Sequence, residues 1–381
     1  MKPFDPEKTL PDLVPRHQAG CATSHISDGG PKTRTRTKLS KRRSAKVIAA
    51  AEMADRVADA AVRHERTEAV LMARAIALAG LPKRPTDAKH LSRTLRLGTQ
   101  PELWLRVTYA TTVETESLPF GEDRFVLAAI QHLAIEQDSP LVLFDRVGQV
   151  LETFGLSETG ADIQRLRKRF SRLANLCITL TFAPSEDELN QAPNGDRIFV
   201  IKKWALPTRK QLNERGRSDQ LVLPGLNDDD MRSGSFGVVL GADFWQHLQE
   251  PSHRLIAPID LLKMFVDCPT GWDYCLFLLH RCSRAKSIHK IPHDVLMSLF
   301  KDGQKEPDRT VIQRLKKYHR MIQTATRGRL KASLEEDGYA KSTGGRPSKR
   351  WALKVYPSQP IVYSGKKLLP FHEKALNEPG A

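Results

Sequence analysis

The sequence lacks the long apolar runs that a membrane-spanning helix needs. Its apolar stretches, such as Cys275 to Leu279, are far shorter than the roughly 20 residues that cross a bilayer. The first ten residues contain no apolar core of a secretory signal. We therefore expect a cytoplasmic protein that has no membrane partner.

Cysteine is scarce, and its spacing argues against a disulfide framework or a metal site. The chain has five cysteines and no CxxC pair, which fits a reducing compartment. Cys268, Cys275 and Cys282 recur every seven residues, a spacing that places side chains along one stripe of a buried helix. We therefore predict no metal ion and no cofactor.

Motifs of the common enzymes that act on DNA are missing as well. No G-x-x-x-x-G-K-[ST] loop occurs, which argues against an ATPase or helicase. No H-x-H pair is present, as a nicking enzyme would need, and we interpret His289 and His293 as surface or hydrogen-bonded histidines rather than metal ligands. The sequence therefore predicts no catalytic residues, and a protein that is not an enzyme.

What the sequence has in excess is positive charge. Its 381 residues carry 60 Lys and Arg against 44 Asp and Glu, a net charge of +16. Residues 1–100 have a net charge of +10, residues 101–206 of −4, residues 207–233 of zero and residues 234–381 of +10. An excess of this size favours a polyanionic partner, and its uneven distribution predicts separate units.

The N-terminal part is predicted to be an arm followed by a long helix. Residues 1–43 are rich in Pro, Gly, Ser and Thr, and eight Lys or Arg without an acid lie between Lys32 and Lys46, which indicates a disordered basic arm. Residues 44–80 are rich in Ala with apolar residues near helical spacing, and Gly80 would end this helix. We interpret the helix as a solvent-exposed linker, with dimerisation or contact along DNA as the alternative.

Residues 101–206 show the element order of a winged helix-turn-helix domain. The predicted elements are helix 125–135, strand 141–144, helix 147–154, a helix from 161 to about 176, and strands 178–182 and 197–204. The third helix has an apolar stripe and an opposite basic face on which we expect no compensating acid. That face predicts DNA contact by four cations, with a solvated charged face as the alternative: Arg165, Lys168, Arg169 and Arg172.

The same order recurs in residues 234–357, after a polar linker or insertion at 207–233 and before a C-terminal tail at 358–381. The predicted elements are strand 238–240, helix 244–248, helix 261–281, strand 288–291, helix 292–300, helix 308–325, and strands 330–336 and 351–356. The fold class is therefore α+β, with two tandem winged helix-turn-helix domains.

The helix 308–325 has the more clearly divided faces, with Val311, Leu315, Tyr318, Ile322 and Ala325 on its apolar side. The opposite side predicts direct readout of base edges, because Arg and Gln can pair bidentately with bases. Its residues are Arg309, Gln313, Lys316, Arg320 and Arg327, with Lys317 and His319 flanking them. The wing adds Arg346, Lys349 and Arg350, for which an ordinary solvated loop is the alternative.

Several short motifs resemble those of plasmid-encoded RepA-type replication initiators, and together they cover about residues 101–357. They are Leu118-Pro119-Phe120-Gly121, Arg165-Leu166-Arg167 with Arg172-Leu173, Phe244-Trp245, Pro258-Ile259-Asp260-Leu261, and Trp272-Asp273-Tyr274-Cys275-Leu276-Phe277-Leu278. The resemblance implies a bacterial tandem winged-helix initiator. Such proteins bind repeats in double-stranded DNA at a plasmid origin, help to open an AT-rich segment, and recruit the host initiator and the replicative helicase.

The resemblance also implies a division of roles. The first domain would serve homodimerisation and backbone contact, and Arg309, Gln313, Lys316 and Arg320 would read bases. The basic arm departs from the part of the family that the motifs cover. One alternative function is a winged-helix transcriptional repressor. Another is a site-specific recombinase or nickase, against which the predicted inward orientation of Tyr318 argues.

Overall fold

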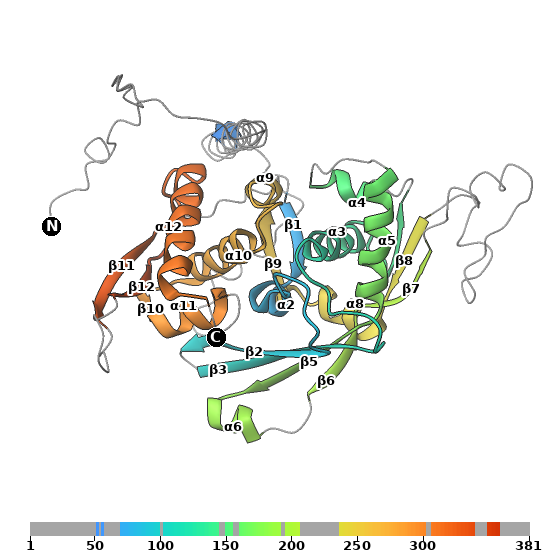
Figure 1. Cartoon of the computed structure of the whole chain (residues 1–381), viewed down its shortest axis with the longest axis horizontal. Helices are drawn as coiled ribbons and strands as arrows, with labels where there is room; N and C mark the ends of the chain where they lie inside the picture. Colours follow the sequence, from blue (N-terminus) through green and yellow to red (C-terminus); the bar gives the residue numbers. More distant parts are fainter. Residues whose placement is uncertain are drawn as a thin grey trace, which may run out of the picture. The chain divides into compact units, whose positions relative to one another are not determined.

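The computed structural model describes residues 51–52, 55–56, 69–99, 102–144, 149–154, 160–191, 195–205, 236–301, 306–339 and 349–358 (Figure 1). The chain divides into a unit of residues 1–46 and a unit of residues 47–381, and the described residues all belong to the second. The predicted basic arm, the linker 207–233 and the tail from residue 359 lie outside the described residues.

The segment before Gly80 differs from the predicted long helix. Residues 69–73 form strand β1 (Ala69–Ala73), and the helix that follows, α2 (Arg74–Ala79), has six residues. β1 pairs antiparallel with β9 (Arg254–Pro258), from Ala69 opposite Pro258 to Ala73 opposite Arg254. The prediction of one helix to residue 80 was therefore wrong at 69–73, because pairing with a distant strand overrides the helix propensity of an Ala-rich segment.

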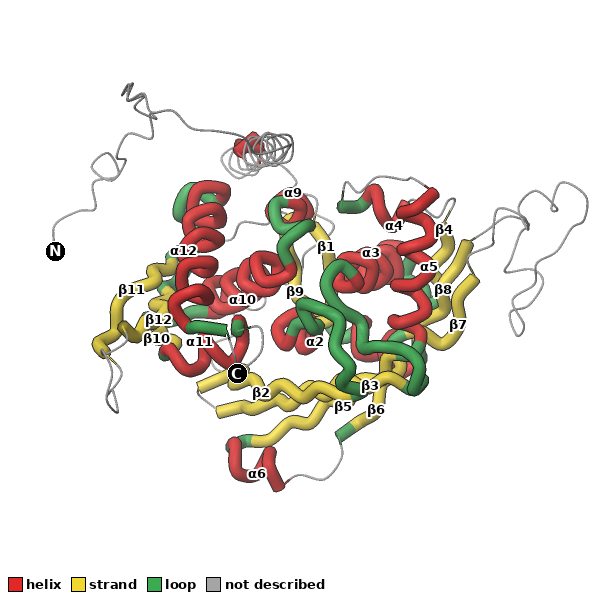
Figure 2. The backbone as a smooth tube through the Cα atoms, in the orientation of Figure 1, coloured by secondary structure: helices red, strands yellow, loops and turns green. Residues whose placement is uncertain are grey.

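Four strands form an antiparallel sheet that the sequence predicted only in part. Its order is β2 (His90–Thr99), β3 (Glu102–Thr111), β5 (Leu176–Ala183) and β6 (Asp196–Phe199). Leu105, Val107 and Tyr109 of β3 are buried on its inner face. The short helix α6 (Glu186–Gln191) lies at one end of the sheet (Figure 2). No element was predicted for 81–117, so β2 and β3 are additions.

A second, three-stranded sheet crosses the predicted domain boundary. Its order is β4 (Leu141–Phe144), β8 (Phe236–Leu240) and β7 (Ile201–Ala205). The predicted strand 197–204 is divided at the buried Val200, so that β6 and β7 join different sheets. The sequence assigned strand 238–240 to the second domain, whereas its hydrogen-bonded neighbours are β4 and β7 of the first.

Helices fill the space beside these sheets. α3 (Asp123–Glu136) is buried along most of its length, and α5 (Gly160–Ala174) packs on it through Leu166, Phe170 and Leu173. α4 (Gln149–Glu152) and α8 (Ala242–Gln249) also pack on α3. The prediction of helices at 125–135, 147–154, 161–176 and 244–248 is therefore confirmed, with shifted ends.

Strand β9 was not predicted, and from residue 259 onward the elements follow the predicted order with one correction. The predicted helix 261–281 is two helices, α9 (Ile259–Lys263) and α10 (Pro269–Arg284), because Pro269 begins a new helix and cannot continue one. Strand β10 (His289–Ile291), α11 (His293–Phe300), α12 (Asp308–Ala325), β11 (Ala332–Tyr339) and β12 (Lys349–Val355) follow. The last sheet has the order β10-β12-β11. Cys275 and Cys282 are buried on α10, as predicted. Cys268 precedes α10 and is only partly buried, so the predicted stripe of three cysteines was wrong at that position.

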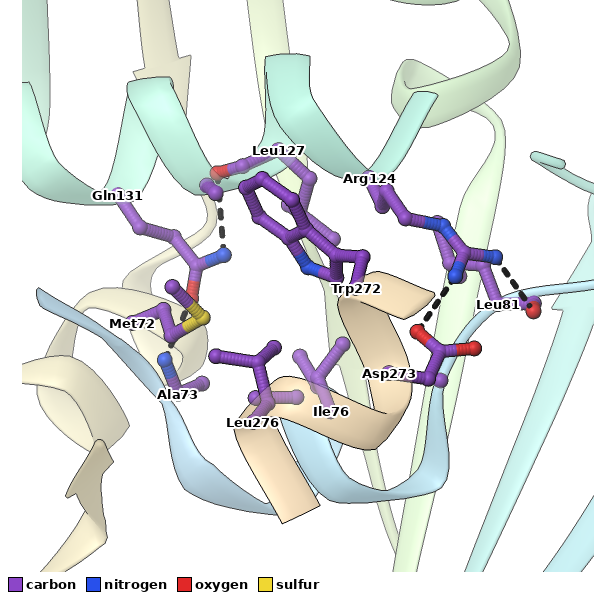
Figure 3. Close-up of a pocket in the computed structure, with 13 residues that line it drawn as sticks. Met72, Ala73, Ile76, Leu81, Arg124, Leu127, Gln131, Trp272, Asp273 and Leu276 are labelled. Carbon is purple, nitrogen blue, oxygen red and sulfur yellow. Dashed lines mark hydrogen bonds and ion pairs between the residues drawn. The ribbon is translucent and has the colours of Figure 1, made fainter. Parts of the chain in front are cut away.

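A buried ion pair joins α3 to α10 (Figure 3). Arg124 of α3 pairs with Asp273 of α10, and its guanidinium also donates to the carbonyl oxygens of Pro269 at 2.8 Å and Leu81 at 2.9 Å. Gly80 has a φ of +65°, and a Cβ there would lie 2.8 Å from Asp273 Oδ2, so this turn requires glycine. Trp272 and Asp273, which begin the RepA-like motif at 272–278, are therefore buried between elements of the two predicted domains.

Candidate nucleic-acid interface

The two faces of α12 are divided as the sequence predicts. Val311, Ile312, Leu315, Tyr318, Ile322 and Ala325 are buried. The side chains predicted to contact DNA are exposed: Arg309, Gln313, Lys316, Lys317, Arg320 and Arg327. A helix that is held on its domain by its apolar side can present its polar side to the major groove of DNA. The arrangement is able to bind DNA, and DNA contact itself stays a prediction.

The first turn of α12 is fixed by an ionic cluster. Asp308 accepts hydrogen bonds from Lys301 Nζ at 3.0 Å and from His293 Nε2 at 3.1 Å. Partial burial acts to raise the pKa of Asp308, but these hydrogen bonds outweigh it and lower the pKa below its ordinary value. His293 Nδ1 accepts from the backbone N–H of Trp351 at 3.3 Å. His293 is therefore a buried, hydrogen-bonded histidine, one of the two states that the sequence analysis gave it.

The middle of α12 is anchored to α10 and to β11. His319 Nδ1 lies 3.0 Å from the hydroxyl of Tyr274, and its Nε2 lies 3.1 Å from the carbonyl oxygen of Ala332. Burial lowers the pKa of His319, although the bond to the backbone of Ala332 acts in the opposite direction, so the ring is neutral near pH 7. His319 does not flank the exposed basic face as predicted, because it packs inward.

Tyr318 also points inward, as predicted. Its hydroxyl lies 2.8 Å from Cys268 Sγ, and its ring packs edge-on against Phe265 with ring centroids 5.8 Å apart. Burial, together with the hydrogen bond to Cys268, raises the pKa of Tyr318 well above its ordinary range. A tyrosine nucleophile has to be exposed and readily deprotonated, so these contacts disfavour Tyr318 in that role.

The wing cations make ion pairs on the protein itself. Lys349 Nζ lies 2.8 Å from Glu336 Oε1 across the β11–β12 pair, and Arg350 pairs with Asp294 of α11. Exposed pairs of this kind contribute little to stability, so a phosphate can compete for either cation. Arg346 lies outside the described residues.

Sequence reasoning missed Trp351 as part of this surface. Lys316 Nζ lies 3.4 Å from the centroid of the Trp351 ring, in a cation–π contact. Trp351 of β12 therefore contacts and positions Lys316, one of the residues predicted to read bases. Its place in strand 351–356 was predicted, but the strand register that brings it beneath Lys316 depends on pairing that the sequence does not reveal.

The basic residues of α5 have different surroundings. Arg172 makes two hydrogen bonds of 2.7 Å to Asp123, and its guanidinium lies 4.7 Å from the Phe120 ring centroid. Arg169 is buried and pairs with Glu122.

Near the start of α5, Arg165 pairs with Asp162 at 3.1 Å, and Lys168 is exposed. The prediction of four uncompensated cations on this face was therefore wrong. Acids from the start of α3 and from α5 itself compensate three of them. Glu122 and Asp123 directly follow Leu118-Pro119-Phe120-Gly121, but only the tertiary structure shows that they meet α5.

The described part of the chain offers neither a metal-binding cluster nor a membrane-spanning helix. It contains no group of three or more His, Cys, Asp and Glu side chains that could hold a metal ion. None of its helices combines the length and the apolar character that crossing a membrane requires.

Comparison with known proteins finds likeness only among solved structures. No family model matches the chain, and no curated protein sequence matches it. A crystal structure of RctB domains 2 and 3, residues 155–483, is 11% identical, with a TM-score of 0.44, and the match covers 74% of this chain and 96% of that one. A selenomethionine derivative of the same two RctB domains is 11% identical, with a TM-score of 0.46, and the match covers 76% of this chain and 100% of that one.

Proposed function

We propose that this chain is a sequence-specific, non-enzymatic DNA-binding protein that initiates replication at a plasmid origin. The observation that carries the proposal is the exposed face of α12, where Arg309, Gln313, Lys316 and Arg320 face away from a buried apolar side. Gln pairs bidentately with adenine and Arg with guanine in the major groove. Such a face can hydrogen-bond to base edges as well as attract the phosphates electrostatically.

The elements around α12 support a winged helix as the DNA-binding module. From α10 to β12 they run helix, strand, helix, helix, strand, strand, and the sheet has the order β10-β12-β11. In this proposal α12 enters the major groove, and β11 and β12 are the strands of the wing. Arg165 and Lys168 of α5 contact the DNA backbone from the other predicted domain.

Initiation is favoured over repression by the motifs that resemble RepA-type initiators. A repressor would use the same DNA-contacting residues, so the α12 face alone does not separate the two functions. Initiation requires further partners, namely the host initiator and the replicative helicase, and a second copy of this chain is proposed as the partner in dimerisation.

Base reading by α12 is tested with Arg320→Ala and Gln313→Ala. The wild-type chain first selects its binding site from a random duplex library. On that site each variant is expected to lose about 1–3 kcal/mol of binding free energy and to accept other bases at one position. Fluorescence anisotropy on the selected and on unselected duplexes measures both effects.

The control is Lys286→Ala, which removes an exposed cation outside α12 and should lower binding to both duplexes by the same small factor. If Arg320→Ala and Gln313→Ala also weaken both duplexes equally, the face binds charge and does not read sequence.

Initiation itself is tested with a plasmid whose only origin is the gene and its flanking DNA. Transformants should be recovered with the intact gene and lost with a frameshift. A plasmid that replicates with the frameshift would contradict initiation, and repression of a reporter by the intact protein would then favour the repressor.

A further inference from the structure

The basic side of α5 lines a hollow in the surface. The hollow has a volume of about 440 Å³. Its walls come from α5, from residues 83–85 after α2, from residues 120–123 before and at the start of α3, and from Asp267 and Pro269, before and at the start of α10. Small-molecule sites in proteins have volumes of roughly 300–1,000 Å³. The hollow is therefore large enough for a phosphate-bearing ligand.

The lining of this hollow is strongly cationic. Six of its residues are Lys or Arg and three are Asp or Glu, an excess of three positive charges. Arg84 and Lys168 are exposed, whereas Arg169 and Arg172 lie deeper. Four of the six cations come from residues 101–206, whose net charge is −4, so positive charge of this region is concentrated at one place.

The deeper cations are held in fixed positions. Asp123 binds Nε and Nη2 of Arg172, which engages two of the five N–H donors of that guanidinium. Glu122 fixes Arg169, and Lys83 Nζ donates to the carbonyl oxygen of Phe300. A site whose donors are already ordered loses less conformational entropy when it binds an anion.

We infer that this hollow binds phosphate groups, with Arg84 and Lys168 as direct ligands and Arg172 as a deeper donor. Guanidinium and ammonium groups are the side chains that bind phosphate oxygens in proteins. Two sources can supply such a phosphate, namely the DNA backbone and a free phosphate compound. Binding of the DNA backbone rests on the proposed function, whereas binding of a free phosphate compound does not.

The test compares the wild-type full chain with two double variants. Arg84→Ala/Lys168→Ala removes two exposed cations from the hollow. The matched control, Arg197→Ala/Lys286→Ala, removes an exposed Arg and an exposed Lys elsewhere, so both variants have the same net charge. Circular dichroism checks that both are folded, and the remaining basic segments are identical in all three chains.

The first arm titrates inorganic pyrophosphate by calorimetry. The dissociation constant should rise at least about tenfold in the hollow variant and less than about twofold in the control. The second arm measures binding of an unselected 20-base-pair duplex against salt. Each lost backbone contact should reduce the slope of log K against log salt by about 0.9.

The outcomes separate the two sources. A weaker pyrophosphate affinity with an unchanged duplex slope identifies a free phosphate compound, and a reduced slope identifies the DNA backbone. Equal behaviour of the two variants in both arms would overturn the inference, even if the α12 variants lose sequence-specific binding. If the chain binds no DNA at all, the pyrophosphate arm alone decides.

Discussion

α5 and α12 are both amphipathic helices with several cations on one side, but their cations have different neighbours. On α5, Arg169 and Arg172 are bound by Glu122 and Asp123. On α12, Arg309, Lys317 and Arg320 are exposed. Within the described part of the chain, acids from another element therefore neutralise part of the basic face of α5 and none of these three cations of α12, although both faces look alike in the sequence.

The position of the acids explains the difference. Asp123 is 1% exposed and lies at the start of α3, directly against the basic side of α5. The acids near α12, Asp308 and Glu306, instead bind Lys301, His293 and Arg314 at its first turns. They order the helix and leave its outer face cationic.

The largest expected effect comes from removing one arginine from each helix. Arg172→Ala should lower the free energy of unfolding by about 3 kcal/mol, because it removes the nearer of the two arginines that pair with the buried Asp123. The other, Arg169, lies 3.8 Å from the Asp123 carboxylate. Arg320→Ala should change it by less than about 0.5 kcal/mol, because the side chain is exposed. Urea unfolding followed by circular dichroism measures both.

Arg172→Lys is the matched control for charge. It keeps the positive charge but cannot donate two parallel hydrogen bonds to the Asp123 carboxylate. Its stability should therefore lie between those of the wild type and Arg172→Ala. Equal unfolding midpoints for Arg172→Ala and Arg320→Ala would show that the two helices do not differ in this way.

The elements around α12 could be predicted from the sequence because their signals are local. Helix 308–325 was predicted with the bounds that the structure has, from a start signal at Asp308 and an apolar repeat along one face. The wing strands were predicted from β-rich segments on either side of a polar loop, and the structure begins each two residues from the predicted position.

The remaining fold depends on contacts between distant segments. β1 pairs with β9 across more than 180 residues, and β8 lies between β4 and β7, which precede it in the chain. The same holds for the interface, since the compensation of α5 by Asp123 is a tertiary contact. The RepA-like motif at 272–278 lies in the buried α10, so this motif reflects core packing rather than DNA contact.

A smaller effect should separate the helices by pH. α12 carries His319, whose pKa is lowered by burial, whereas α5 contains no histidine. Below about pH 6.5 the unfolded state therefore binds a proton at this histidine that the folded state does not. The stability that the neutral His319 contributes is complete above that pH and falls as the pH drops toward the pKa of the folded state. Between pH 7.5 and 5.5 the loss is expected to be on the order of 1 kcal/mol.

His319→Gln isolates this contribution. The variant should be less stable at pH 7.5 but should lose less stability on acidification, and the other buried histidines affect both chains equally. Hydrogen exchange should show the acid-sensitive amides in α12 rather than in α5. A pH dependence identical in the two chains would place the titration on other groups.

The smallest expected effect tests whether an acid beside α5 lowers its affinity for DNA. Asp162→Asn removes the partner of Arg165, whose side chain is 68% exposed. Stability should fall by only about 0.5 kcal/mol, from an exposed pair and from the favourable position of an acid in the first helical turn. Affinity for unselected DNA at low salt should rise slightly, because Arg165 becomes available to a phosphate and one repulsive charge is lost. Anisotropy titrations in 50 mM salt measure it, with Asp243→Asn in the first turn of α8 as the control. An equal rise in both variants would mean that net charge matters and that the pairing of Arg165 does not.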